Sequence, residues 1–105
     1  MHCSRVVAAT DEDGPFVFDV PLGPDGEATL SRPTGGWWGT LRSNQIYPFI
    51  LHKDGRLDFG AEPEDDLEDR YGFTDLFDGP ISLGRRVNVE VWGEAYNALI
   101  IQIEP

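Results

Sequence analysis

Carboxylates are the groups in this chain with the greatest capacity for chemistry, and they crowd into one segment. From Asp54 to Asp78 the sequence holds ten Asp or Glu residues and two Arg residues, which makes a net charge of −8 within a total of −11. Such a concentrated negative field attracts cationic partners and speeds their association. A solvated face that only keeps the chain soluble is the other interpretation. The residues we predict to bind a basic protein are Glu64, Asp65, Asp66, Glu68 and Asp69.

The pair Trp37-Trp38 is the second candidate binding feature. It lies within a glycine-rich stretch, 34–40. Because neighbouring residues of a strand point to opposite faces, the two indole rings cannot enter the same core layer. An exposed Trp is typical of protein interfaces, and an aromatic platform also stacks on sugars or bases. The pair therefore supports an alternative function, a small-ligand or carbohydrate-binding module, beside ordinary packing of one ring in the core.

The sequence offers little for catalysis or metal binding. Cys3 is the single cysteine, and no local pattern places His2 or His52 beside it as a base. The stretch 11–14 is acidic and ends in Gly, but it lacks the alternate spacing of a calcium loop. No phosphate loop, nucleophile elbow or dinucleotide fingerprint is present in the sequence. We therefore predict a protein that is not an enzyme and that has no catalytic residue, metal or cofactor.

Length and charge argue against several further classes of protein. The chain has 105 residues, a length that predicts a single domain spanning residues 1–105. Its acidity argues against direct binding of nucleic acid or of an anionic membrane, although carboxylates spaced like phosphates would suit a nucleic-acid mimic. No apolar run approaches the roughly 20 residues that span a bilayer, and the first residues lack the apolar core of a secretory signal. We expect a cytoplasmic protein, and the sequence leaves its oligomeric state open.

Short runs of Val, Ile, Phe and Trp alternate with Gly and Pro, which is typical of an all-β domain. Residues 10–15 predict a turn between strands 5–9 and 16–20. The x-Pro-Asp-Gly pattern at 23–26 predicts a second turn, which leads into a strand over 27–31. Closure of the sheet would remove exposed strand edges. We expect a small barrel or sandwich of six to eight short, mainly antiparallel strands, with at most one short helix, near residues 63–71.

Two hairpins allow the register to be predicted. Asp54-Gly55 suits a two-residue type I′ turn, which sets His52 opposite Leu57. Both faces of the first strand then carry apolar side chains, with Ile50 on one face and Phe49 and Leu51 on the other. In the last hairpin, a three-residue loop over 93–95 keeps the aliphatic residues together. The residues predicted to share that inner face are Val87, Val89, Val91, Leu99, Ile101 and Ile103.

These observations indicate a non-enzymatic acidic interaction module that binds a basic surface, as an inhibitor, an immunity-type protein or an adaptor would. The alternatives are the small-ligand or carbohydrate module based on Trp37 and Trp38, and the nucleic-acid mimic.

Overall fold

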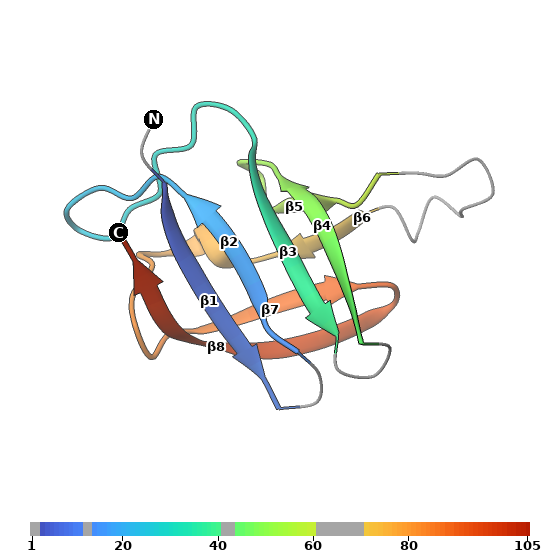
Figure 1. Ribbon diagram of the computed structural model, residues 1–105. Helices are drawn as coiled ribbons and strands as arrows, with labels where there is room; N and C mark the ends of the chain where they lie inside the picture. The colour runs from blue at the N-terminus through green and yellow to red at the C-terminus, as the bar shows by residue number, and fades with distance from the viewer. Residues whose placement is uncertain (1–2, 12–13, 41–43, 61–70) are drawn as a thin grey trace.

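Strand pairing follows the order of the chain and closes on itself. The computed structural model describes residues 3–11, 14–40, 44–60 and 71–105. Each strand is antiparallel to the next, and β1 also pairs with β8, so the eight strands form a closed barrel (Figure 1). The expected all-β architecture is confirmed. The strands are β1 (Ser4–Thr10), β2 (Phe16–Val20), β3 (Thr34–Thr40), β4 (Gln45–Leu51), β5 (Arg56–Asp58), β6 (Tyr71–Thr74), β7 (Arg86–Val91) and β8 (Glu94–Glu104).

The core is built from alternate residues of each strand. On β2, Phe16, Phe18 and Val20 are fully buried, and on β7 the three valines are buried between exposed neighbours. An eight-stranded barrel is just wide enough for side chains to fill its interior. Rings from several strands meet there, and Trp38 stacks on Phe16 with ring centroids 5.2 Å apart. The predicted alternation therefore places one apolar face of each strand inside the barrel.

The β4–β5 hairpin differs from the predicted two-residue turn. Its loop has three residues, 53–55: the His52 N–H donates to the Arg56 carbonyl, and the Gly55 N–H donates back to the His52 carbonyl. A type I′ turn needs a positive φ at Asp54 as well, and only Gly55 has one, at +90°. The added loop residue sets Leu51 opposite Leu57.

This change of register determines which β4 side chains face the barrel interior and which face the solvent. Leu51 and Phe49 are buried in the barrel, whereas Ile50 is 50% exposed and lies opposite Asp58. The expectation that His52 opposes Leu57 is therefore wrong, and β4 has only one face in the core.

The register of the β7–β8 hairpin also corrects the prediction. Its turn has two residues, Trp92 and Gly93, both at positive φ, +52° and +78°. A bulky residue in this region is strained. The three-residue loop is predicted because it keeps the aliphatic residues of both strands on one face. Packing outweighs the strain, because the Trp92 ring lies 5.0 Å from Trp38 and 4.7 Å from Tyr47. The three β7 valines consequently share the interior with Tyr96, Ala98 and Ile100, and not with Leu99 and Ile101. Ile103 does pack against the core, because a register shift between β1 and β8 sets it opposite the buried Val6.

The other predicted elements have different outcomes. The turn at 23–26 is confirmed by the hydrogen bond from the Gly26 N–H to the Gly23 carbonyl, at 3.1 Å. The strand expected over 27–31 is reduced to one bridge between Leu22 and Ala28. Of the helix expected near 63–71, Tyr71 instead begins β6 and the rest lies outside the described residues. Within the described residues, the one helical element is the 3-10 turn η1 (Leu76–Asp78).

Gly55 provides a test of the β4–β5 hairpin. A Cβ at Gly55 would lie 2.3 Å from the Thr74 carbonyl oxygen, and its φ of +90° is unfavourable for any other residue. We predict that Gly55→Ala lowers the free energy of unfolding by about 3 kcal/mol or more, because backbone strain and a backbone clash act together. Gly84→Ala is the matched control. Gly84 has nearly the same φ, +86°, but open space around it, so about 1 kcal/mol is expected. Equal losses in urea unfolding followed by circular dichroism would contradict this account.

Candidate functional site

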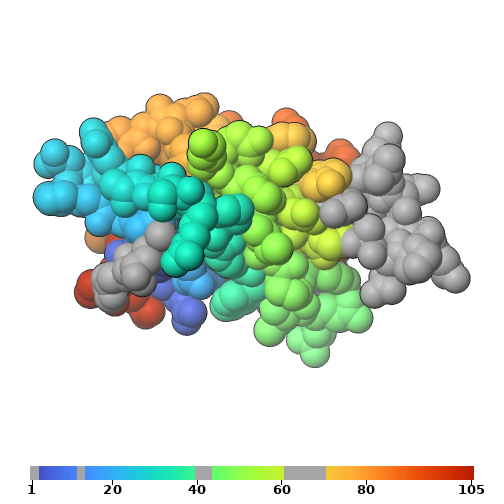
Figure 2. Space-filling view, turned by 90° about the horizontal axis from the view of Figure 1, so that it is seen from above, coloured from blue at the N-terminus to red at the C-terminus, as the bar shows by residue number. Residues whose placement is uncertain are grey.

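Three neighbouring hollows lie on the side of the barrel formed by the β4–β5 turn, β6 and β7. The first, of about 450 Å³, lies between residues 27–30, Lys53 and residues 77–80. The central hollow has about 420 Å³ and shares Asp78 with the first. The third has about 310 Å³ and shares Phe73 and Glu90 with the central one. We call the three together the acidic groove. Figure 2 looks down on the end of the barrel where the cyan, yellow-green and orange segments around the first hollow meet.

Negative charge dominates the lining of the acidic groove. The lining residues include six carboxylates and one cation, Lys53, which lies in the first hollow, and no described residue forms an ion pair with Asp78, Glu90 or Glu27. Carboxylates without counter-ions on a low-dielectric surface produce a field that draws cations inward. The carboxylates of the acidic groove are Glu27, Asp54, Asp75, Asp78, Glu90 and Glu94.

Phe73 forms an aromatic ridge between the central and third hollows. On β6 the neighbours Gly72 and Thr74 are buried, so alternation turns Phe73 outward, where its side chain is 53% exposed. It lies between Arg56 and Glu90 in the sheet. The Arg56 guanidinium is placed over the Tyr71 ring instead, 5.2 Å from its centroid. An exposed ring among carboxylates suits a partner cation, because the ring face and the carboxylates both attract positive charge.

Hydrogen bonds to β7 fix the wall of the central hollow. Asp75 Oδ1 accepts the Asn88 N–H at 2.8 Å, and Asp75 Oδ2 accepts from Asn88 Nδ2 at 3.3 Å. The Thr74 hydroxyl donates to the Asn88 carbonyl and accepts the Leu76 N–H. Asp75 therefore has a structural role, while Asp78 and Glu90 make no side-chain hydrogen bond to the described residues.

On the other side of this wall, the Arg85 side chain binds backbone carbonyl groups of residues 75–80. Its guanidinium donates to the carbonyl oxygens of Asp75, Leu76, Gly79 and Pro80, at 2.8 to 3.1 Å. These bonds satisfy backbone groups of η1 and the following loop that no strand can pair. The rigid donor fork of arginine suits this arrangement, and the single ammonium of lysine does not. Within the basic pair Arg85-Arg86, Arg85 therefore has a structural role.

Arg85 and Arg86 make a matched pair for a stability test. We predict that Arg85→Ala lowers the free energy of unfolding by about 2–4 kcal/mol, because four carbonyls lose a charged donor, and that Arg85→Lys recovers less than half of this. Arg86→Ala should cost less than about 1 kcal/mol, since the exposed Arg86 side chain has one hydrogen bond, to Asn97 Oδ1. Thermal and urea unfolding of the three variants measures these differences. Similar losses for Arg85→Ala and Arg86→Ala would show that the carbonyl contacts are unimportant.

Three of the four described carboxylates of the predicted acidic segment lie in the acidic groove, and Asp58 does not. Asp54, Asp75 and Asp78 line it, although 21 positions separate the first two along the chain. The predicted binding residues Glu64, Asp65, Asp66, Glu68 and Asp69 lie outside the described residues. Three groove carboxylates were missed by sequence reasoning because they come from other elements: Glu27, Glu90 and Glu94. The alternation of β7 turns Glu90 outward, but only the sheet order places it beside Phe73.

The two tryptophans are divided as their adjacency predicts. Trp38 is 3% exposed and contacts Phe16, Tyr47, Trp92 and Tyr96 in the core, where its Nε1 has no hydrogen-bond partner among the described residues. Trp37 is half-buried on the outer surface of β3. A small-ligand platform at this pair would therefore depend on Trp37.

This division predicts unequal costs of truncation. Trp38→Ala should lower the free energy of unfolding by about 3–5 kcal/mol, because it leaves a cavity among four rings. Trp37→Ala should lower it by about 1 kcal/mol, since its ring already contacts water. Urea unfolding followed by far-ultraviolet circular dichroism measures both without relying on tryptophan emission. Equal costs would mean that Trp37 also belongs to the core.

Among the described residues, no group of three or more His, Cys, Asp or Glu side chains is arranged to hold a metal ion. The same residues contain no helix with the length and apolar character needed to cross a membrane. Comparisons with models of protein families, with curated proteins and with solved structures found no match to this chain. The geometry of the acidic groove is therefore the basis for a functional conclusion.

Proposed function

We propose that the protein is a non-enzymatic interaction module that binds a basic protein surface through its acidic groove. Inhibitors, immunity-type proteins and adaptors work in this way. The observation that carries the proposal is the convergence of five carboxylates from separate chain segments in the two hollows that the exposed Phe73 lines, with Glu27 in the adjoining first hollow. The predicted binding residues from Glu64 to Asp69 belong to the connection between β5 and β6, and we include them in the proposal on sequence grounds.

Two kinds of physical interaction support this function. The carboxylates of the acidic groove supply long-range attraction, which raises the association rate and weakens as salt is added. Phe73 supplies short-range contact, since a Lys or Arg side chain has an apolar stem and a cationic head that interacts with an aromatic face. We place the protein in the cytoplasm, where Cys3 would remain a free thiol, as it is in the structure.

Charge reversal inside and outside the groove tests the proposal. We predict that the double variant Asp78→Lys, Glu90→Lys weakens binding of synthetic octa-arginine to the full chain at least tenfold, because two attractive carboxylates are replaced by repulsive ammonium groups. Asp25→Lys, Glu104→Lys is the control, since both residues are exposed, neither lines the groove and the net charge changes equally. Calorimetric titration at low and high salt gives the affinities. Amide shifts at Phe73, Asn88 and Glu90 locate the peptide.

Equal weakening by the two double variants would mean that net charge alone attracts the peptide, and the groove would lose its role. The same variants then serve in affinity capture of natural partners. A captured protein that releases DNA when this chain binds would assign the module to nucleic-acid mimicry.

A further inference from the structure

The third hollow of the acidic groove brings aromatic residues and carboxylates together. Three of its lining residues are aromatic and come from β6 and the β7–β8 turn: Tyr71, Phe73 and Trp92. Glu90 and Glu94 line the same hollow. The central hollow has four carboxylates, but Phe73 is its one aromatic residue. The third hollow therefore offers a cation a kind of contact that the rest of the groove lacks.

The strand register places the Phe73 ring next to the Glu90 carboxylate. These two residues lie directly opposite each other in the β6–β7 pair, and Ala95 of β8 lies opposite Glu90 on its other side. All three are exposed. Opposite residues of an antiparallel pair have Cβ atoms about 4.5–5.5 Å apart. A planar group stacked on the Phe73 ring is therefore within reach of Glu90, and the small Ala95 side chain covers little of that carboxylate.

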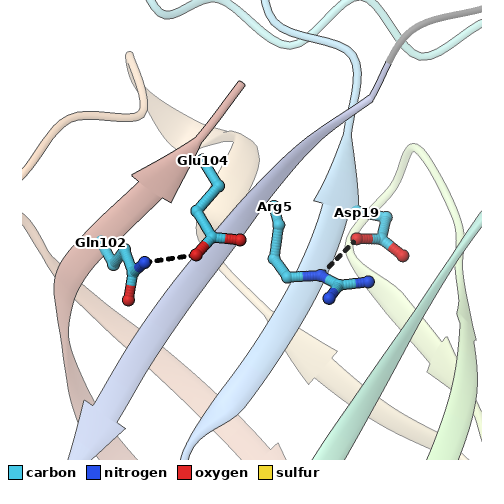
Figure 3. A network of polar contacts seen from close by, with 4 residues as sticks. All are labelled: Arg5, Asp19, Gln102 and Glu104. Atoms are coloured by element: carbon cyan, nitrogen blue, oxygen red, sulfur yellow. Dashed lines mark hydrogen bonds and ion pairs between the residues drawn. The ribbon is translucent and has the colours of Figure 1, made fainter.

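None of the described Lys or Arg residues lines the third hollow. Arg5 is on β1, where its Nε forms an ion pair with Asp19 Oδ1 of β2 at 3.4 Å (Figure 3). Arg85 donates to backbone carbonyls, and Arg86 donates to Asn97 Oδ1. The described part of the chain thus leaves the third hollow to a cation of the partner.

An arginine side chain matches this hollow better than a lysine side chain. The guanidinium is planar, so it can stack on a ring while two of its N–H groups donate to one carboxylate. The ammonium of lysine is compact and strongly hydrated, and it gains less from an aromatic face. The chain contains an example of the preferred contact, because the Arg56 guanidinium lies 5.2 Å from the centroid of the Tyr71 ring. No cation of the described residues lies over Phe73 in this way.

We propose that the third hollow is a pocket for one arginine side chain of the basic partner, with the guanidinium stacked on Phe73 and hydrogen-bonded to Glu90. This inference rests on the proposed function, because the carboxylates of the other hollows attract the basic surface to the groove. It adds that the partner presents an arginine at this position, for which lysine is a poor substitute. Arginine is among the residues that contribute most to binding at protein interfaces.

Octa-arginine and octa-lysine test this preference, because the two peptides have the same length and charge. We predict that the full chain binds octa-arginine about fivefold more tightly or better, and that Phe73→Leu lowers this ratio to about twofold or less. Phe73→Leu keeps every carboxylate, so the affinity for octa-lysine should change by less than about twofold. Phe73→Tyr retains a ring and should keep the ratio. Leu83→Ala is the control outside the groove, because Leu83 is 64% exposed in the loop before β7.

Equal affinity of the wild type for the two peptides overturns the proposal, and so does a Phe73→Leu variant that keeps the preference for arginine. Amide shifts at Val91 and Ala95 should be larger with octa-arginine than with octa-lysine, and equal shifts contradict the pocket. Failure of the proposed function has a different signature: neither peptide binds, or Asp78→Lys, Glu90→Lys binds both peptides as the wild type does. Far-ultraviolet circular dichroism and the unfolding midpoint confirm that each variant retains the fold.

Discussion

The aromatic cluster around Trp38 is the interaction on which the rest of the structure depends. Its ring lies between 5.0 and 5.9 Å from the rings of Phe16, Tyr47, Trp92 and Tyr96. These residues come from β2, β4, the β7–β8 turn and β8, so one side chain on β3 joins strands from around the barrel. Large rings fill the interior of an eight-stranded barrel with few partners, and that filling makes closure favourable.

The cluster also decides the register of the last hairpin. Trp92 accepts a left-handed backbone conformation because its ring gains contacts with Trp38, Tyr47 and Phe59. Such strain is of order 1–3 kcal/mol, which is comparable to the burial of one large side chain. This turn sets which residues of β8 lie opposite the β7 valines, whereas the place of Glu90 beside Phe73 follows from the pairing of β6 with β7.

Two surfaces of opposite character result from the same alternation. Outward positions of β1 to β4 are mostly apolar or glycine, whereas those near the β4–β5 turn, β6 and β7 carry carboxylates around Phe73. Pro48 belongs to the first surface without disturbing the ladder, because hydrogen bonding of β4 to β5 uses Ile50 and His52, and β5 has ended before it reaches Pro48. A proline is tolerated in a strand where no N–H is required.

The sequence by itself determined the fold class, the first hairpin, the turn at 23–26 and the division of Trp37 from Trp38. Each follows from side-chain alternation or from turn chemistry, which act over a few residues. Tertiary structure decided the registers of the two later hairpins, where the preference for a short glycine turn at Asp54-Gly55 and for a three-residue loop after Trp92 yielded to core packing. It also decided the acidic groove, because bringing Glu27, Asp78 and Glu90 to one surface depends on contacts between distant strands that local pattern does not encode.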